Sequence, residues 1–224
     1  MKRIKLKDRL LPDYTKGEEV FNMVSHIAGG AVGICAVVLC VIMAALHHNV
    51  FGVVGSAIYG ASMIILYACS SIYHGLSPRL MAKKVFQVID HCAIFILISG
   101  TYTPICLSAL REFSPALGWS IFGLVWAAAV LGITLNAIDL KKYHRISAVC
   151  YLAMGWCIVL AWKAARFMAL RGGLWLLLAG GIAYTIGALF YYLLKNTRYM
   201  HSVFHLFVVA GSIFHFFYIL LYIV

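Results

Sequence analysis

The chain has 224 residues, of which 64% are hydrophobic and 11% are charged, and its formal net charge at pH 7 is +11. Soluble domains hold roughly 45 to 50% apolar and about 25% charged residues, so this composition excludes a water-soluble fold. The basic residues stand in short runs between apolar segments, as in anchors at an anionic membrane surface. We therefore expect an all-α integral membrane protein that binds no nucleic acid.

The chain begins with a basic segment, residues 1–20, that is too charged and too poor in continuous apolar sequence to be a cleavable signal. We expect it to stay as a cytoplasmic tail, followed by a single membrane domain over residues 21–224. At about 20 residues for each crossing, seven helices use nearly all of this domain. The predicted spans are 21–46, 50–75, 87–110, 115–138, 146–168, 173–194 and 201–224.

The distribution of Lys and Arg predicts the orientation, because these residues are enriched in cytoplasmic loops. With the N-terminus inside, 14 of the 18 basic residues lie on the inner side of the membrane. The outer side then holds only Arg111, Lys163, Arg166 and Arg171. This split predicts a seven-transmembrane helix bundle with a cytoplasmic N-terminus and an outer C-terminus.

The first predicted span carries a stripe of polar and small residues on one face. At 100° per residue the stripe covers about 60°, and Ser25 borders it. Its members are Glu19, Asn22, His26, Gly29 and Gly33. Such a face is expected to point into the bundle, with the Gly29-x-x-x-Gly33 pair permitting close helix packing.

The seven cysteines fall inside apolar segments, at positions 35, 40, 69, 92, 106, 150 and 157. No two of them have the C-x-x-C spacing of redox and thiolate-metal motifs. We expect them to be buried free thiols.

Unusual polar residues collect near the inner ends of the later spans. His201 and His205 have i, i+4 spacing, which puts both imidazoles on one helix face about 6 Å apart in rise and suits two ligands of one metal ion. His74 lies at matching depth at the inner end of the second span and is the best candidate for a third ligand. Three histidines with a fourth position open would be a catalytic type of zinc site.

Asp90 is the only carboxylate expected inside a predicted span. Intramembrane acids are costly and are by default functional or paired, so beside a metal Asp90 would accept a proton from water or orient it. Ser70, one turn before His74 on the same face, would support the site or touch substrate. His91 follows Asp90 but is turned by about 100°, and we expect it to be a structural hydrogen-bond partner.

The remaining histidines have simpler interpretations. His47, His48 and His144 are expected in solvent-exposed loops. His215 shares the face of His201 and His205, but lies roughly 15 to 20 Å deeper in the membrane and cannot bind the same ion. A lone H-x-x-x-H pair at a membrane boundary is often interfacial polarity, so the metal hypothesis depends on His74 and Asp90 at the same depth.

The residues of the site also carry a resemblance. The motifs are Glu19-x-x-Asn22-x-x-Ser25-His26, Ser70-x-x-x-His74, DHCAIFILISGTYTP from Asp90, YLAMGW from Tyr151, and His201-x-x-x-His205. The chain resembles, from residue 18 onward, the hemolysin III family of bacterial membrane proteins, relatives of the progestin and adipoQ receptors and of alkaline ceramidases.

The resemblance implies a seven-helix bundle in the bacterial inner membrane. It also implies zinc held by His74, His201 and His205, with Asp90 contacting a water molecule at the metal and Ser70 nearby. Branches of this group resemble zinc hydrolases of lipid amides or receptors, and the bacterial branch is named for haemolysis and linked to membrane-lipid homeostasis.

Two function classes remain open from the sequence. The first is a zinc-dependent hydrolase of a lipid-like amide or ester, in which Asp90 is the base. The second is a non-enzymatic sensor, receptor-like regulator or pore-forming cytolysin, in which zinc only clamps helices. A proton-coupled transporter is a weaker third hypothesis, because a single buried acid makes a thin proton relay. The sequence indicates no substrate and no oligomeric state.

Overall fold

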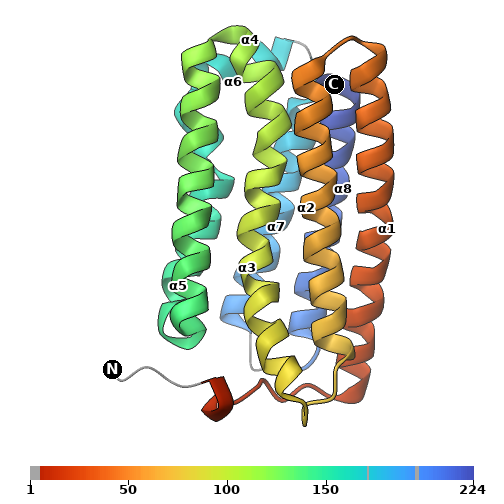
Figure 1. Ribbon diagram of the computed structural model, residues 1–224, viewed down its shortest axis with the longest axis vertical. Coiled ribbons are helices and arrows are strands. Elements are labelled where there is room, and N and C mark those ends of the chain that lie inside the picture. Colours follow the sequence, from red (N-terminus) through yellow and green to blue (C-terminus); the bar gives the residue numbers. More distant parts are fainter. Residues whose placement is uncertain (1–5, 171, 195–196) are drawn as a thin grey trace.

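The computed structural model describes residues 6–170, 172–194 and 197–224, and the described chain forms an elongated bundle of helices without strands (Figure 1). Lys2, Arg3, Lys5, Arg171 and Lys195, which contributed to the predicted orientation, lie outside these residues. The elements are η1 (Leu6–Asp8), α1 (Lys16–Leu46), α2 (Val50–Gly75), α3 (Met81–Pro104), η2 (Ile105–Leu110), α4 (Arg111–Phe113), α5 (Pro115–Gly155), η3 (Cys157–Ala161), α6 (Trp162–Leu170), α7 (Leu174–Leu193) and α8 (Met200–Tyr222).

Six helical stretches of the described chain are long and apolar enough to cross a membrane. The protein is therefore a multi-pass membrane protein. The fourth stretch, Pro115–Met168, has 54 residues, whereas one crossing needs about 20. Its internal geometry decides how the predicted spans 115–138 and 146–168 are related.

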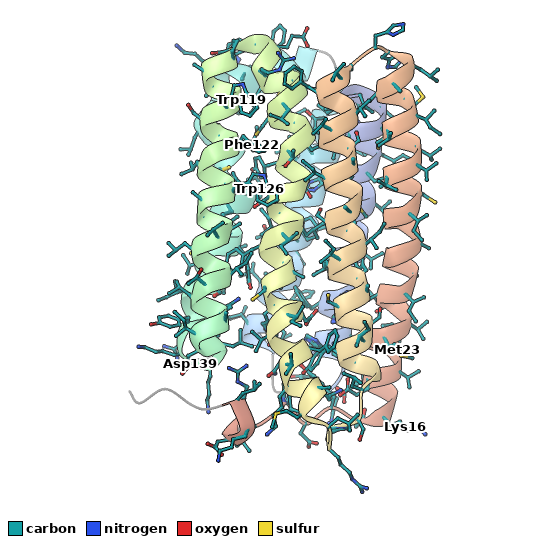
Figure 2. The ribbon with its side chains drawn as sticks, viewed as in Figure 1. Lys16, Met23, Trp119, Phe122, Trp126 and Asp139 are labelled. Carbon is teal, nitrogen blue, oxygen red and sulfur yellow. The ribbon has the colours of Figure 1, made fainter. Side chains whose placement is uncertain are left out.

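The chain reverses its direction inside α5, at Asp139. The backbone of Asp139 is extended, with φ −159° and ψ 93°. Ser147 Oγ donates to Asn136 Oδ1 at 2.6 Å, and Asn136 Nδ2 donates to the Tyr151 hydroxyl at 3.2 Å. In a straight helix residues 136 and 147 would be about 16 Å apart, so these contacts require a sharp turn. Asp139 lies at the same end of the bundle as Lys16 (Figure 2).

The returning segment reaches the other end of the bundle. It passes through η3 into α6, where the ring of Phe167 lies 5.4 Å from that of Phe113 in α4. The sequence predicted a loop over residues 139–145, but those after Asp139 are helical. Lys142 N donates to Asp139 Oδ1 at 3.1 Å, so the turn residue itself caps the returning helix.

α1 begins at Lys16, five residues before the predicted span. Thr15 Oγ1 accepts from Glu18 N at 3.2 Å, and the Glu18 carboxylate accepts from Thr15 N at 2.8 Å. This capping box satisfies two backbone donors that the helix leaves free. Glu18 and Glu19 therefore lie inside the helix, and Asp139 lies inside α5.

α3 also begins early, at Met81, where the sequence predicted residue 87. Lys83 thus lies in its first turn, and it is buried although the sequence placed it in a cytoplasmic loop. Beyond Pro104 the helix continues through the π-helical η2 into α4, so this crossing extends to Phe113.

Close contact between α1 and α2 confirms that the polar stripe of α1 faces the bundle. Asn22, His26, Gly29 and Gly33 are all buried. A Cβ atom at Gly29 would stand 2.5 to 2.7 Å from ring atoms of Tyr67, so only glycine permits this approach.

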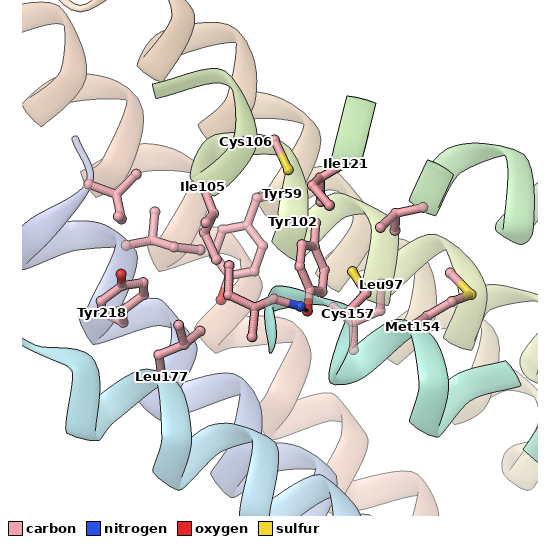
Figure 3. Close-up of a cluster of buried hydrophobic side chains, with 14 of the residues drawn as sticks. Tyr59, Leu97, Tyr102, Ile105, Cys106, Ile121, Met154, Cys157, Leu177 and Tyr218 are labelled. Carbon is pink, nitrogen blue, oxygen red and sulfur yellow. Dashed lines mark hydrogen bonds between the residues drawn. The ribbon is translucent and has the colours of Figure 1, made fainter. Parts of the chain in front are cut away.

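The apolar core joins α2, α3, α5, α7 and α8, and Tyr59, Tyr102 and Tyr218 lie within it (Figure 3). Polar contacts cross it as well, because the Tyr67 hydroxyl donates to Ser212 Oγ at 2.6 Å and so joins α2 to α8. All seven cysteines are free. Cys35 is exposed on the bundle surface, whereas the other six are partly or fully buried.

Candidate metal centre

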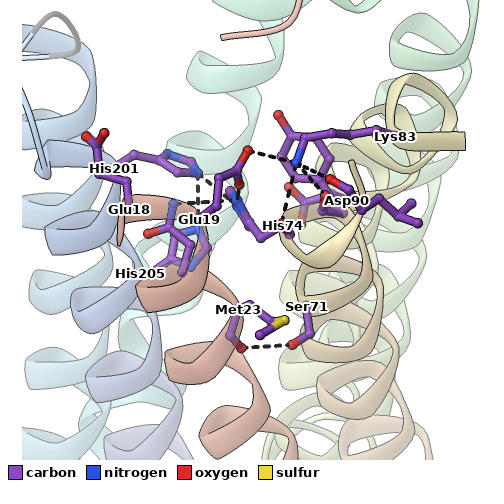
Figure 4. Close-up of polar contacts among 12 residues, drawn as sticks. Glu18, Glu19, Met23, Ser71, His74, Lys83, Asp90, His201 and His205 are labelled. Atoms are coloured by element: carbon purple, nitrogen blue, oxygen red, sulfur yellow. Dashed lines mark hydrogen bonds and ion pairs between the residues drawn. The ribbon is translucent and has the colours of Figure 1, made fainter. Parts of the chain in front are cut away.

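Three imidazoles from two helices converge near the end of the bundle that holds Lys16. α2 contributes His74 from its last turn, and α8 contributes His201 and His205 from its first two turns. His201 Nε2 lies 3.3 Å from His74 Nε2 and 3.1 Å from His205 Nε2 (Figure 4). Within the described residues, one ligand atom from each lies within 4.8 Å of the others, which makes this a group that could hold a metal ion.

The spacing of these nitrogens fits a tetrahedral ion. Zn–N bonds of about 2.0 to 2.1 Å place neighbouring ligand nitrogens about 3.3 to 3.4 Å apart, and the two measured separations are 3.3 and 3.1 Å. Imidazole ligands suit zinc, copper, iron and nickel. The residues present therefore fit the metal that the sequence predicts.

A carboxylate contacts the ring nitrogen of His74 that points away from the other two histidines. Glu19 Oε2 lies 2.6 Å from His74 Nδ1. An ionised carboxylate only accepts hydrogen bonds, so His74 carries its proton on Nδ1 and turns the lone pair of Nε2 toward His201. Asn22 Nδ2 is 3.5 Å from the same Nδ1, too far to compete. Metal-ligating histidines commonly have such a carboxylate partner. The sequence predicted Glu19 and Asn22 as polar residues of a bundle-facing stripe that would support the site or have a structural role.

Two aromatic rings cover the imidazoles of α8. His26 of α1 stacks on His205, with ring centroids 3.6 Å apart, and Tyr14 stacks on His201 at 5.0 Å. Burial raises the pKa of Tyr14 far above its ordinary value, and the nearby Tyr191, Tyr73, Glu19 and Asp90 raise it further. The phenol is therefore neutral at physiological pH. Sequence analysis placed Tyr14 in a cytoplasmic tail and missed it.

The predicted catalytic residues are buried near the cluster. Ser70 Oγ lies one turn before His74 and has no hydrogen-bond partner among the described residues. Asp90 of α3 is 7% exposed and lies outside the group of three histidines. Its Oδ2 is 3.8 Å from His91 Nδ1, which is itself 2.8 Å from the carbonyl oxygen of Gln87. Figure 4 shows Asp90 on the side of the site formed by α3, the helix that also carries Lys83.

The other polar residues singled out in the sequence have local partners. Ser25 Oγ donates to the carbonyl of Asn22 at 3.0 Å, within the first turns of α1. His215 lies 3.1 Å from the carbonyl oxygen of Leu177, away from the cluster. His47, His48 and His144 are exposed, as predicted, but His144 lies in the returning helix of α5 rather than in a loop.

Comparison with known proteins assigns the family. A family model described as Haemolysin-III related matches residues 14–216. The chain belongs to this family. It is 37% identical over 207 residues to Hemolysin-3 of Bacillus cereus, covering 92% of both chains. It is 35% identical over 209 residues to the Hemolysin-3 homolog of Bacillus subtilis (strain 168), covering 93% of this chain and 96% of the relative.

A more distant human relative is the monocyte to macrophage differentiation factor, 26% identical over 167 residues, or 71% of this chain and 66% of that protein. The region matched by the haemolysin-III related model runs from Tyr14 to beyond His205. It therefore contains the three histidines, the rings that cover them, Glu19 and Asp90.

Proposed function

We propose that this protein is a seven-transmembrane zinc hydrolase of the inner membrane, with a cytoplasmic N-terminus, that acts on a lipid-like amide or ester. The reversal at Asp139 supports seven crossings, since it divides Pro115–Met168 into two antiparallel segments. The proposed orientation puts four further basic residues on the cytoplasmic side, as the charge distribution predicts: Arg79, Lys84, Lys141 and Arg145. The Bacillus relatives support a bacterial membrane.

The convergence of His74, His201 and His205 is the observation that carries the proposal. Three imidazoles leave a fourth tetrahedral position for water or substrate, as in catalytic sites, whereas structural zinc sites are usually closed by four protein ligands. A bound zinc ion would polarise the substrate carbonyl and lower the pKa of water to about 7.

The acid and the hydroxyl of the chain would perform the remaining steps. Asp90 is buried on the α3 side of the site and accepts a proton from the attacking water. It then returns the proton to the leaving amine or alcohol. Among the described residues the buried hydroxyl of Ser70 has no hydrogen-bond partner, and a donor of this kind would bind the carbonyl oxygen of the substrate as charge develops on it.

The location of the site selects the substrate class. The cluster lies at the ends of α2 and α8 that the charge distribution predicts to be cytoplasmic, and both helices are apolar enough to cross a membrane. A lipid in the inner leaflet would bring its polar linkage to this depth while its chains stay among the helices. The basic residues at the same end would attract anionic lipids.

One observation favours a non-enzymatic alternative. All three histidines come from α2 and α8, two helices that Tyr67 and Ser212 already join. A metal held there would act as a clamp, in a receptor-like regulator or in a cytolysin such as the name of the Bacillus cereus relative suggests.

Asp90→Asn separates these functions, because an amide keeps the shape of the carboxylate but cannot accept the proton. The measurements are zinc content, melting temperature and release of fatty acid from a panel of amide and ester lipids, with the exposed Asp13→Asn as control. We expect zinc-dependent release in wild type that disappears in Asp90→Asn while zinc is retained. Absence of release from every lipid in wild type, with metal and stability both reduced in the variant, would favour the clamp.

A further inference from the structure

Lys83 is a buried cation that neither the sequence motifs nor the proposed reaction accounts for. Its side chain is 2% exposed. Its Nζ donates to the carbonyl oxygens of Tyr73 at 2.9 Å and of Leu76 at 3.0 Å. These carbonyls belong to the C-terminal end of α2, where helices leave acceptors unsatisfied and favour a positive charge. His74 is between these two residues, so Lys83 holds the turn that carries it.

The same ammonium forms an ion pair that leads to the site. Nζ lies 2.7 Å from Glu19 Oε1, while Glu19 Oε2 lies 2.6 Å from His74 Nδ1 (Figure 4). One carboxylate thus bridges a lysine of α3 and a histidine of α2. The Glu19 side chain is only 15% exposed, and a carboxylate largely removed from water is unfavourable without a cation. Among the described residues Lys83 is the lysine that contacts Glu19.

We propose that Lys83 is the positioning residue of the metal centre, acting through Glu19 on His74. It balances the charge of Glu19 and fixes the direction of this carboxylate. The carboxylate in turn keeps the proton of His74 on Nδ1 and its Nε2 turned toward His201 and His205. This inference rests on the proposed metal centre and concerns how tightly and in what geometry the metal is held.

A purely structural role for Lys83 predicts something different. If the ammonium only ties the end of α2 to the start of α3, its removal lowers stability without dependence on Glu19. If it acts through Glu19, the two residues form one pathway and their effects on metal affinity are not additive. Lys84 is a matched control, because it is the adjacent lysine, is only partly buried, and donates at 2.6 Å to the carbonyl oxygen of Lys7 in the tail.

The experiment measures zinc affinity of the purified full chain by competition with a chelator, and the absorption spectrum of the cobalt form. We expect Lys83→Met and Glu19→Gln each to weaken zinc affinity about 10- to 100-fold, the usual effect of losing a partner behind a ligand. The double variant should be no weaker than Glu19→Gln alone, and Lys84→Met should match wild type. The cobalt spectrum should change in Lys83→Met, since the orientation of His74 changes.

Unchanged affinity in Lys83→Met, or additive losses in the double variant, would overturn the inference while leaving the metal centre intact. Failure of wild type to bind zinc would instead overturn the proposed metal centre itself. If Lys83→Met does not fold, Lys83→Arg keeps the charge and is expected to retain affinity better than Glu19→Gln. Equal loss in those two variants would then contradict the proposal.

Discussion

The imidazole of His26 lies flat against that of His205, with ring centroids 3.6 Å apart and planes 16° apart. The stack joins α1 to α8, and both side chains are buried. Neither ring nitrogen of His26 has a hydrogen-bond partner within the described chain. We therefore expect the flat ring of His26 to fix the orientation of the His205 imidazole by stacking on it.

Replacement of His26 tests whether the shape of the ring is what matters. His26→Phe keeps a flat ring and should retain wild-type metal content and melting temperature. His26→Ala leaves a cavity against His205 and should reduce the free energy of unfolding by roughly 2 to 5 kcal/mol, the range for large-to-alanine changes in cores. Metal loss in His26→Phe as large as in His26→Ala would show that the nitrogens of His26 are required.

Tyr14 is expected to slow the exchange of metal with the solvent, because its ring covers His201. Tyr14→Ala should release zinc faster than wild type. The measurement is the stopped-flow rate at which zinc passes from the protein to a colorimetric chelator. Tyr14→Phe keeps the ring and should match wild type, since the phenol is neutral and carries no charge to lose. Equal release rates in all three proteins would contradict this covering role.

Gly29 and Gly30 form a matched pair for the packing of α1 on α2. A Cβ at Gly29 meets the ring of Tyr67 at 2.5 Å, whereas at Gly30 it meets Tyr67 Cβ at an ordinary 3.7 Å. Gly29→Ala should lower the free energy of unfolding by about 1 to 3 kcal/mol through overpacking. Gly30→Ala should be neutral or stabilising by up to about 1 kcal/mol, because alanine favours helix. Thermal unfolding in detergent measures both, and the reverse order would exclude this helix contact.

Reporter fusions test the number of crossings. With seven spans and a cytoplasmic N-terminus, fusions after Arg79 and Lys141 should report the cytoplasm, and one at the C-terminus the outer side. The decisive stretch is Pro115–Met168. If it crossed only once, the C-terminus would share the side of the N-terminus, and a cytoplasmic C-terminal reporter would overturn the seven-span proposal.

Periodicity and depth were enough to predict which histidines meet. The i, i+4 spacing of His201 and His205 is a property of any helix, and His74 followed from its position at the same end of another span. The sequence also placed a chain reversal at residues 139–145, but the charged residues there predicted a loop. They are helical because the Asp139 side chain caps the returning helix at Lys142, a local signal that a count of apolar residues ignores.

The contacts around the site depend on tertiary structure and could not be predicted. Lys83 appeared to be a loop lysine because the hydropathy of α3 rises only after it, yet the end of α2 and Glu19 supply enough acceptors to bury it. Tyr14 lies in a charged segment. It reaches His201 because the described residues before α1 lie across the end of the bundle at which α1 begins (Figure 1). The Thr15 and Glu18 capping box was readable in the sequence, and it would have placed Glu19 inside α1.

The central claim is that His74, His201 and His205 hold one zinc ion. Metal analysis with zinc X-ray absorption spectroscopy of the purified protein tests it most directly, with His205→Ala and the control His215→Ala measured alongside. We expect about one zinc per chain, with three nitrogen neighbours at about 2.0 to 2.1 Å, lost in His205→Ala and retained in His215→Ala. A wild-type protein without stoichiometric zinc, or equal retention in both variants, would contradict the account.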